Sequence, residues 1–410
     1  MADPTAILAD LVRRPSVNPM GRDLVGPEYL EGRVTDYLLR RLETAGIAAV
    51  RQPVAAGRDN VIARLPATVA DAPVLIWDVH QDTVPVSGMI IEPFTPTVRD
   101  GRLAGRGACD VKGGMAAMVA ALERLQTAVE RRATVIFVAS VNEEFGFSGA
   151  HAFTRLLLTG APDARLPTDR PAADLIGADV LGSLPVLTVV AEPTRLAMVT
   201  QHKGAVRWRM IAGGRACHSS HPEDGANAIY PAARAAVAIE QLATELLTRQ
   251  AEHPCGPPTL SIGTIHGGTG VNLVPDRVVL EIDRRLVPGE DSVAARQEVI
   301  DVIEAACTGD EITHEPPFLE SGGLSCAGQA AATAADLLAK AINQAGFTAR
   351  QEAARYGTNA CVYAAAGLAC VVFGPGSIAQ AHTADEWIDL REVEQATEIL
   401  KNLVVYNSSA

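Results

Sequence analysis

The sequence predicts an α/β fold with a mainly parallel, helix-covered sheet and a smaller inserted domain. Short apolar runs at residues 74–79, 134–141 and 186–191 lack polar alternation, which is typical of parallel strands buried on both faces. The three runs are followed by His80, by Asn142-Glu143-Glu144 and by Glu192. From about residue 203 to 318 the expected elements follow the order β-α-β-β-α-β, which is that of the ferredoxin-like unit. These three observations predict the fold class.

Length and composition indicate a globular protein. The 410 residues are enough for two or three domains, and 48% hydrophobic with 20% charged residues suits a packed core. No apolar run approaches the roughly 18–20 residues of a membrane span. Residues 1–10 lack the basic start and apolar core of a signal peptide. The seven cysteines are scattered without a CxxC pair, which favours a reduced compartment, so we expect a cytoplasmic location and no membrane partner.

The charge balance argues against a nucleic-acid partner. A net charge of −13 does not favour a surface that follows phosphates. A local basic cluster has two interpretations, a solvated strand face or a grip on an acidic group of a substrate. It comprises Lys203, Arg207, Arg209 and Arg215.

The first part of the chain alternates helices and strands. Apolar residues recur at helical spacing in 28–45, and Pro and Gly make 85–107 an expected loop region. Asp110 follows on a loop that leads into a helix, whose N-terminus can hold a carboxylate in place. Gly113 and Gly114 let the first turn of that helix approach its neighbours closely. The other elements expected here are helices at 5–14 and 115–127 and a strand at 61–65.

The inserted domain is predicted at 203–318, between a first part at 1–202 and a second part at 319–410. Its elements are strands at 205–211, 259–265, 278–286 and 311–314 and helices at 227–247 and 293–306. The α/β pattern then returns with a helix at 329–345 and a strand at 369–373, followed by the loop 374–386.

Potential metal ligands lie at or after the predicted strand ends. Open α/β sheets bind ligands at the carboxyl ends of their strands, so we expect these side chains to gather there. Imidazole nitrogens and carboxylate oxygens suit a zinc-type ion, and a bridging carboxylate can hold two ions about 3.5–4 Å apart. Taken singly, each residue also fits a structural role, such as a polar pair or a solvated turn. The set is His80, Asp110, Glu143, Glu144, Glu192 and His382.

Several segments, in order along the chain, resemble the zinc-dependent amidohydrolases and exopeptidases of metallopeptidase family 20. That family includes acetylornithine deacetylase, succinyl-diaminopimelate desuccinylase, aminoacylase and the glutamate carboxypeptidases. The resemblance runs from about Ser16 to Leu390. Its motifs are His80–Pro85, Gly105–Gly114, Glu143-Glu144 with Gly146, Ala191-Glu192-Pro193, Gly374-Pro375-Gly376 and Ala381-His382-Thr383.

The resemblance implies two zinc ions per subunit, for which Co²⁺ or Mn²⁺ can substitute. Asp110 would bridge them, with His80 and Glu192 on one ion and Glu144 and His382 on the other. Glu143 would be the general base and then the acid, and Asp82 would orient His80. A hydroxide formed from the shared water, its pKa lowered to about 7, would attack the amide carbonyl.

The resemblance also assigns roles in the inserted region, as a lid and dimerisation domain of a homodimer. His218 would stabilise the tetrahedral oxyanion, acting in dimeric members on the partner subunit's site. Asn272 and Arg285 would contact substrate, although Arg285 also fits a strand-surface ion pair. Gly357 and Thr358 would line the pocket beside the metals.

The expected function is hydrolysis of an N-acyl amino acid, acetylated or succinylated. The alternatives are a dipeptidase or carboxypeptidase of the same family, and a non-catalytic binding protein on the same fold. Three positions depart from the family pattern. Val79 replaces a frequent Gly, Asn142 a frequent Asp before the glutamate pair, and Asn359 a frequent Asp of the deacetylase-like members, which unsettles the substrate assignment.

Overall fold

The computed structural model describes residues 2–160, 170–182, 184–325 and 328–406. The chain divides into two compact units. The first unit comprises Met1–Thr200, Cys326–Glu352 and Thr358–Ala410, and the second comprises Gln201–Ser325 and Ala353–Gly357. The sequence predicts changes of domain at 202/203 and 318/319, but not the return at 353–357. Residues 353–357 belong to the second unit because they pack closely against its first residues. A Cβ added to Gly357 would lie 3.0 Å from the carbonyl oxygen of Lys203.

The sheet of the first unit is parallel at its centre and antiparallel at its edges. In the first unit its strands lie in the order β1-β2-β6-β3-β7-β16-β8. The neighbours β6, β3, β7 and β16 pair in parallel, so their carboxyl ends share one edge. The bounds are β1 Ala48–Ala55, β2 Arg58–Leu65, β3 Val74–His80, β6 Thr134–Ser140, β7 Leu187–Val190, β8 Met198–His202 and β16 Cys370–Val372.

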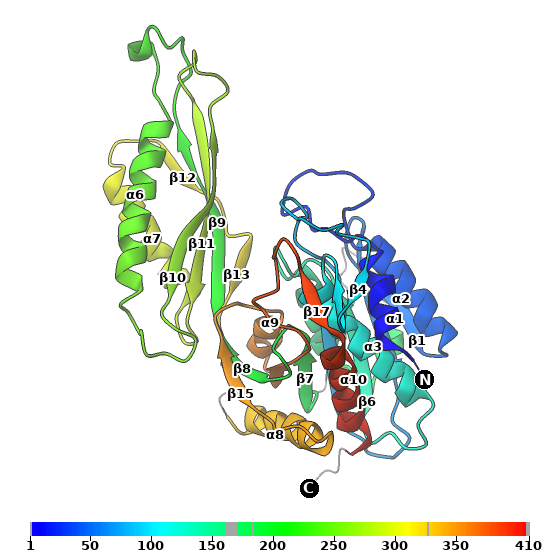
Figure 1. Cartoon of the computed structure of the whole chain (residues 1–410). Coiled ribbons are helices and arrows are strands. Elements are labelled where there is room, and N and C mark those ends of the chain that lie inside the picture. The colour runs from blue at the N-terminus through cyan, green and yellow to red at the C-terminus, as the bar shows by residue number, and fades with distance from the viewer. Residues whose placement is uncertain (1, 161–169, 183, 326–327, 407–410) are drawn as a thin grey trace. The chain divides into compact units, whose positions relative to one another are not determined.

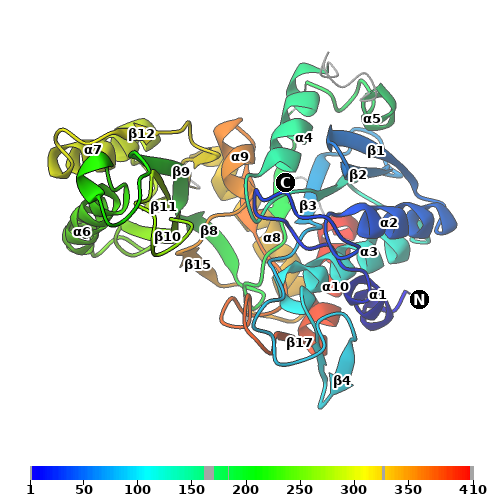
Figure 2. The ribbon, with the colours of Figure 1, turned by 90° about the horizontal axis from the view of Figure 1, so that it is seen from above.

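Helices cover both faces of this sheet (Figure 2), which confirms the predicted α/β fold. The core on one face is formed with α2 (Gly32–Thr44), α3 (Gly113–Gln126) and α8 (Gln329–Gln344), and α1 (Pro4–Val12) and α10 (Leu390–Val405) pack against α3 in the same core. The opposite face carries α4 (Ser148–Thr159), α5 (Arg170–Ile176) and α9 (Ala360–Ala365). Successive side chains of a strand point to opposite faces. Trp77 and Val79 therefore enter the apolar core with α3, whereas Asp78 and His80 point to the other face.

A small second sheet joins distant parts of the first unit. The expected loop region at 85–107 contains β4 (Thr97–Arg99) and β5 (Arg102–Ala104), so predicting it as a loop throughout is wrong. These strands are too short and too exposed to show a pattern of their own. They are defined by pairing, because β17 (Trp387–Asp389) lies against β5.

The second unit has the predicted β-α-β-β-α-β order. Its strands lie in the order β10-β11-β9-β12 with antiparallel pairing, and alternate residues of β11 are buried. Helices α6 and α7 pack on that buried face (Figure 1). The bounds are β9 Gly204–Gly213, α6 Ile229–Leu246, β10 Thr259–Gly267, β11 Arg277–Leu286, α7 Ser292–Ala306 and β12 Ile312–His314. Of the remaining short strands, β13 (Leu319–Ser321) pairs with β9, whereas β14 (Leu324–Ser325) and β15 (Gln351–Ala354) pair with β8. β15 crosses the boundary between the units at Glu352/Ala353.

Within the part of the chain that the structure describes, no helix has both the length and the apolar character needed to cross a bilayer.

Candidate metal centre

The candidate site lies where the carboxyl ends of the central parallel strands meet. Strand β3 ends at His80, β6 leads into Glu143, and β7 leads into Glu192. The segment after β16 carries His382, and it passes close to Glu192, since a Cβ on Gly374 would lie 2.6 Å from the Glu192 carbonyl oxygen. The architecture therefore brings His80 and His382, which are 302 positions apart in the sequence, to the same edge of the sheet.

Asp110 reaches this edge from the turn before α3. That turn needs close contacts, because a Cβ on Gly113 would lie 2.7 Å from the Ala108 carbonyl oxygen. The predicted role of Gly113 in close packing is thus confirmed. Gly107, at φ 79°, occupies the left-handed region that favours glycine.

Two groups of potential metal ligands occur among the described residues, and they share Asp110. The first is His80, Asp110 and Glu192, and the second is Asp110, Glu144 and His382. Asp110 Oδ1 lies 3.1 Å from His80 Nε2, and Asp110 Oδ2 lies 3.2 Å from His382 Nε2. Each oxygen of one carboxylate thus faces a different imidazole, which is the arrangement that a bridging ligand requires.

The charges of the site fit bound cations. Burial, together with the charges of Asp110 and Glu143, raises the pKa of Glu192 well above its usual value. Burial also raises the pKa of Glu143 to about 8, with a further contribution from Glu144. Burial alone would raise the pKa of Asp110, but hydrogen bonds with His382 and His80 outweigh it and lower that pKa. Several carboxylates crowded into a buried space repel one another, and cations between them would favour their charged forms.

Asp82 holds the glutamate pair as well as His80. Its Oδ1 accepts a hydrogen bond from the backbone N–H of Glu143 (3.1 Å), and its Oδ2 accepts one from the backbone N–H of Glu144 (3.1 Å). His80 Nδ1 lies 2.9 Å from the backbone oxygen of Asp82 and 3.7 Å from its Oδ1. If Nδ1 carries the proton for that backbone contact, Nε2 is left free to face a metal.

A buried polar network that the sequence interpretation missed supports Asp82. Asn18 Nδ2 donates to Asp82 Oδ2 (2.7 Å) and to Asn142 Oδ1 (3.0 Å). Arg58 pairs with Glu31 (3.0 Å), whose Oε1 also accepts from the backbone N–H of Asn142 (3.2 Å). No local signal indicates this network, because its members come from separate segments.

The same contacts explain Asn142, where many family members carry Asp. The residue has φ 62°, a left-handed conformation that Asn tolerates better than most residues. Its amide also lies between Asn18 and Ser148, with Glu31 against its backbone. A carboxylate here would add negative charge beside Glu31. Val79, the first departure, is fully buried in the apolar core on the face opposite His80.

Asn359, the third departure, is buried and bonded to the sheet. Its Nδ2 donates to Asp78 Oδ2 (3.0 Å) and to Ser140 Oγ (2.9 Å), while Tyr363 donates its hydroxyl to Asp78 Oδ1 (2.9 Å). In this protein the carboxylate of the pair belongs to Asp78, and Asn359 is its hydrogen-bond donor. Asn359 thus has a structural role in holding Asp78.

Exchanging the partners tests this pairing. Asn359→Asp places two carboxylates face to face and is expected to destabilise the protein by about 1–3 kcal/mol or more. Asp78→Asn alone should cost less, because the hydroxyl of Tyr363 can still donate to the remaining amide oxygen. The double variant Asp78→Asn/Asn359→Asp should recover about 0.5–3 kcal/mol relative to additivity. Urea unfolding of the four proteins measures this coupling, and additive effects would contradict the pairing.

The remaining predicted residues lie in the second unit, except Thr358. His218 is exposed and pairs in a β-bridge with Leu273, while the Asn272 carbonyl accepts from the backbone N–H of Ser219 (3.1 Å). His218 and Asn272 thus lie on adjacent segments. Arg285 Nε lies 2.9 Å from Asp283 Oδ1, so the ion pair considered as its alternative is present. Gly357 closes the second unit beside Lys203, and Thr358 is buried where the first unit resumes.

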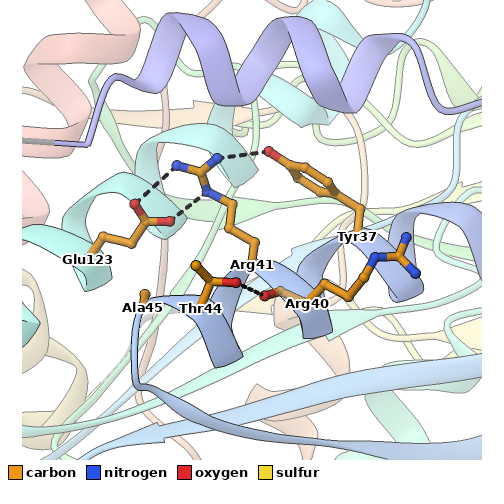
Figure 3. A pocket seen from close by; sticks show the side chains of 6 residues that line it. All are labelled: Tyr37, Arg40, Arg41, Thr44, Ala45 and Glu123. Carbon is orange, nitrogen blue, oxygen red and sulfur yellow. Dashed lines mark hydrogen bonds and ion pairs between the residues drawn. The ribbon is translucent and has the colours of Figure 1, made fainter.

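A surface hollow elsewhere in the first unit contains none of these residues. It lies between α2 and α3 (Figure 3), and the Arg41–Glu123 ion pair spans it, with Arg41 also donating to the Tyr37 hydroxyl (3.2 Å). Arg41 and Glu123 thus already neutralise each other. The lining residues are Tyr37, Arg40, Arg41, Thr44, Ala45 and Glu123.

Comparisons with known proteins agree with this architecture. The profile described as peptidase family M20/M25/M40 matches residues 76–406. Acetylornithine deacetylase of Myxococcus xanthus is 28% identical over 90% of this chain and 91% of the relative. A probable carboxypeptidase of Emericella nidulans is 29% identical over 93% of this chain and 87% of the relative. The solved structure of an M20 family metallo-carboxypeptidase from Sulfolobus solfataricus has a TM-score of 0.75 at 17% identity, covering 99% of both chains, and shares the fold.

Proposed function

The chain belongs to peptidase family M20/M25/M40, whose members are metal-dependent hydrolases of amide or peptide bonds, and we propose that it is a two-zinc N-acyl amino acid amidohydrolase. One observation carries the proposal. Asp110 offers one carboxylate oxygen to each of two ligand groups, and the buried Glu143 belongs to neither group. A two-metal hydrolase needs both a bridging ligand and a carboxylate free to move protons.

The proposed ligands divide between the two groups. His80 and Glu192 would hold one ion and Glu144 and His382 the other, with Asp110 common to both. When bound, the ions supply positive charge that polarises the substrate carbonyl and makes a water more acidic. Co²⁺ or Mn²⁺ suits the same nitrogen and oxygen donors.

Glu143 would carry the proton during the reaction. Its carboxylate takes a proton from the attacking water and then passes it to the nitrogen of the leaving amine, so that the C–N bond breaks and a free amine departs. The same buried group must accept and then release the proton, which a carboxylate close to the reacting atoms can do. Asp82 holds the backbone at Glu143 and Glu144 and keeps these two carboxylates in a defined relation.

The relatives make N-acyl amino acids the first substrate class to test. We expect N-acetyl or N-succinyl amino acids to give the highest kcat/KM in a panel that also contains N-carbamoyl amino acids and dipeptides. Release of free amine is followed for each compound with one enzyme preparation. A carboxypeptidase would instead prefer dipeptides, and the resemblance to the probable carboxypeptidase makes it the second candidate. If the protein hydrolyses no compound of the panel in the presence of added metal, the proposed amidohydrolase function is wrong.

Arg285, Asn272, Gly357 and Thr358 remain proposed substrate contacts, and His218 the proposed donor to the oxyanion. We propose a homodimer formed through the second unit, in which His218 serves the partner's site. His218→Ala is expected to lower kcat by about 10²–10³-fold. Mixing His218→Ala with Glu143→Gln subunits should then restore one working site in each mixed dimer, and the activity of the mixture measures this.

The exposed His221 provides the matched control, and His221→Ala should keep near-normal activity. A mixture that stays inactive although mixed dimers are demonstrated by mass spectrometry would contradict action on the partner's site.

A further inference from the structure

A fully buried carboxylate, Glu386, lies outside the predicted ligand set but touches the turn that carries Asp110. Its Oε1 accepts hydrogen bonds from the backbone N–H groups of Cys109 (2.8 Å) and Asp110 (3.0 Å). Both donors belong to the main chain at the shared ligand itself. A carboxylate that accepts two main-chain N–H groups fixes the position of that backbone.

The second oxygen of Glu386 holds the start of the same turn. Its Oε2 accepts from the backbone N–H of Gly107 (3.0 Å) and from Arg106 Nη1 (2.7 Å), and its own carbonyl accepts from the backbone N–H of Gly105 (3.0 Å). Glu386 thus accepts hydrogen bonds from five of the six residues at positions 105–110. Burial raises the pKa of Glu386 above its usual value, and the N–H groups of Asp110 and Gly107 and the charge of Arg106 offset only part of this rise.

Glu386 also follows His382 by only four residues. The His382 ring is half exposed (52%), so packing alone holds it weakly, yet its Nε2 lies 3.2 Å from Asp110 Oδ2. Directly after Glu386, strand β17 pairs with β5, so this segment is also held to the chain just before the Asp110 turn. The segment that bears His382 and the turn that bears Asp110 are therefore joined at one side chain.

We propose that Glu386 is a positioning residue that sets Asp110 and His382 at metal-binding distance from each other, so that the affinity for the ions depends on it. The inference rests on the proposed two-metal function. Removing either oxygen of Glu386 leaves buried main-chain donors without an acceptor and lets the turn shift. A shift of the shared ligand weakens binding even though every ligand is still present.

The test is metal titration of apo protein, using Co²⁺ absorbance and calorimetry with Zn²⁺. Glu386→Gln keeps the shape of the side chain but turns an N–H₂ group toward backbone donors. It is expected to weaken the affinity for at least one ion by about 10–100-fold. The metal concentration for half-maximal activity should rise by the same factor, while kcat at saturating metal stays within a few-fold of wild type. A residue that only stabilised the fold would lower Tm without moving the metal affinity.

Asp385→Asn is the matched control, because Asp385 is exposed, adjacent and carries the same charge. It should bind metal within about threefold of wild type. If Glu386→Gln fails to fold by circular dichroism, Glu386→Asp carries the test, since its shorter arm keeps the charge but cannot reach all donors. Unchanged affinity and stoichiometry in a folded variant would overturn the inference. If wild type itself binds no metal, the proposed function fails instead.

Discussion

Glu143→Gln is expected to lower kcat by about 10²–10⁴-fold, the usual contribution of a general acid–base group. The amide has nearly the same shape as the carboxylate but cannot accept the proton of the attacking water. Because Glu143 lies outside both ligand groups, the variant should retain its metals. Steady-state kinetics at saturating substrate, with metal content measured on the same sample, checks both halves of this prediction.

The exposed Glu92 offers a control for Glu143, and Glu92→Gln should leave kcat and metal content unchanged. Two outcomes would count against the proposed role. Unchanged kcat in Glu143→Gln would mean that another group moves the proton. Loss of metal together with activity would indicate that Glu143 is itself a ligand. The proposed roles, with Glu144 as ligand and Glu143 as acid–base group, would then be wrong.

Removing the metals is expected to abolish hydrolysis and to lower Tm. The stability part follows from linkage, since an ion present at about 1,000 times its Kd stabilises the folded state by about 4 kcal/mol. Without ions, the charges of Asp110, Glu144 and Glu192 would repel one another in the site. Dialysis against a chelator, followed by separate additions of Zn²⁺, Co²⁺ and Mn²⁺, measures the loss and the recovery. Chelator already saturated with Zn²⁺ controls for effects of the chelator itself.

Substituting single ligands tests whether two ions share Asp110, because Asp110 belongs to both ligand groups and His382 to only one. Asp110→Asn should weaken the binding of both ions, whereas His382→Ala should weaken that of one ion. Elemental analysis of the purified variants gives the stoichiometry. Full activity in metal-free protein would contradict the metal mechanism, and a single ion in saturated wild type would contradict the shared ligand.

The central strands could be predicted because burial on both faces leaves a local signature. Residues 74–79, 134–141 and 186–191 are apolar runs, and β3, β6 and β7 follow them closely. The edge strand β1 (Ala48–Ala55) was missed because its burial is irregular and it includes Pro53. Strands β4, β5 and β17 were missed for a related reason, since each is three residues long and exists only through its pairing.

The sequence by itself determined the central strands, the ferredoxin-like order of the second unit and the set of candidate ligands, because these depend on periodicity and on motifs that lie within a few residues. Only the tertiary structure decided which side chains support those ligands. Glu386 reaches Asp110 across 276 positions, and Asn359 reaches Asp78 across 281. Asn18 reaches Asp82 across 64. A hydrogen bond between distant segments leaves no periodic pattern in either one, so it becomes visible only when the packed sheet has brought both partners to one edge.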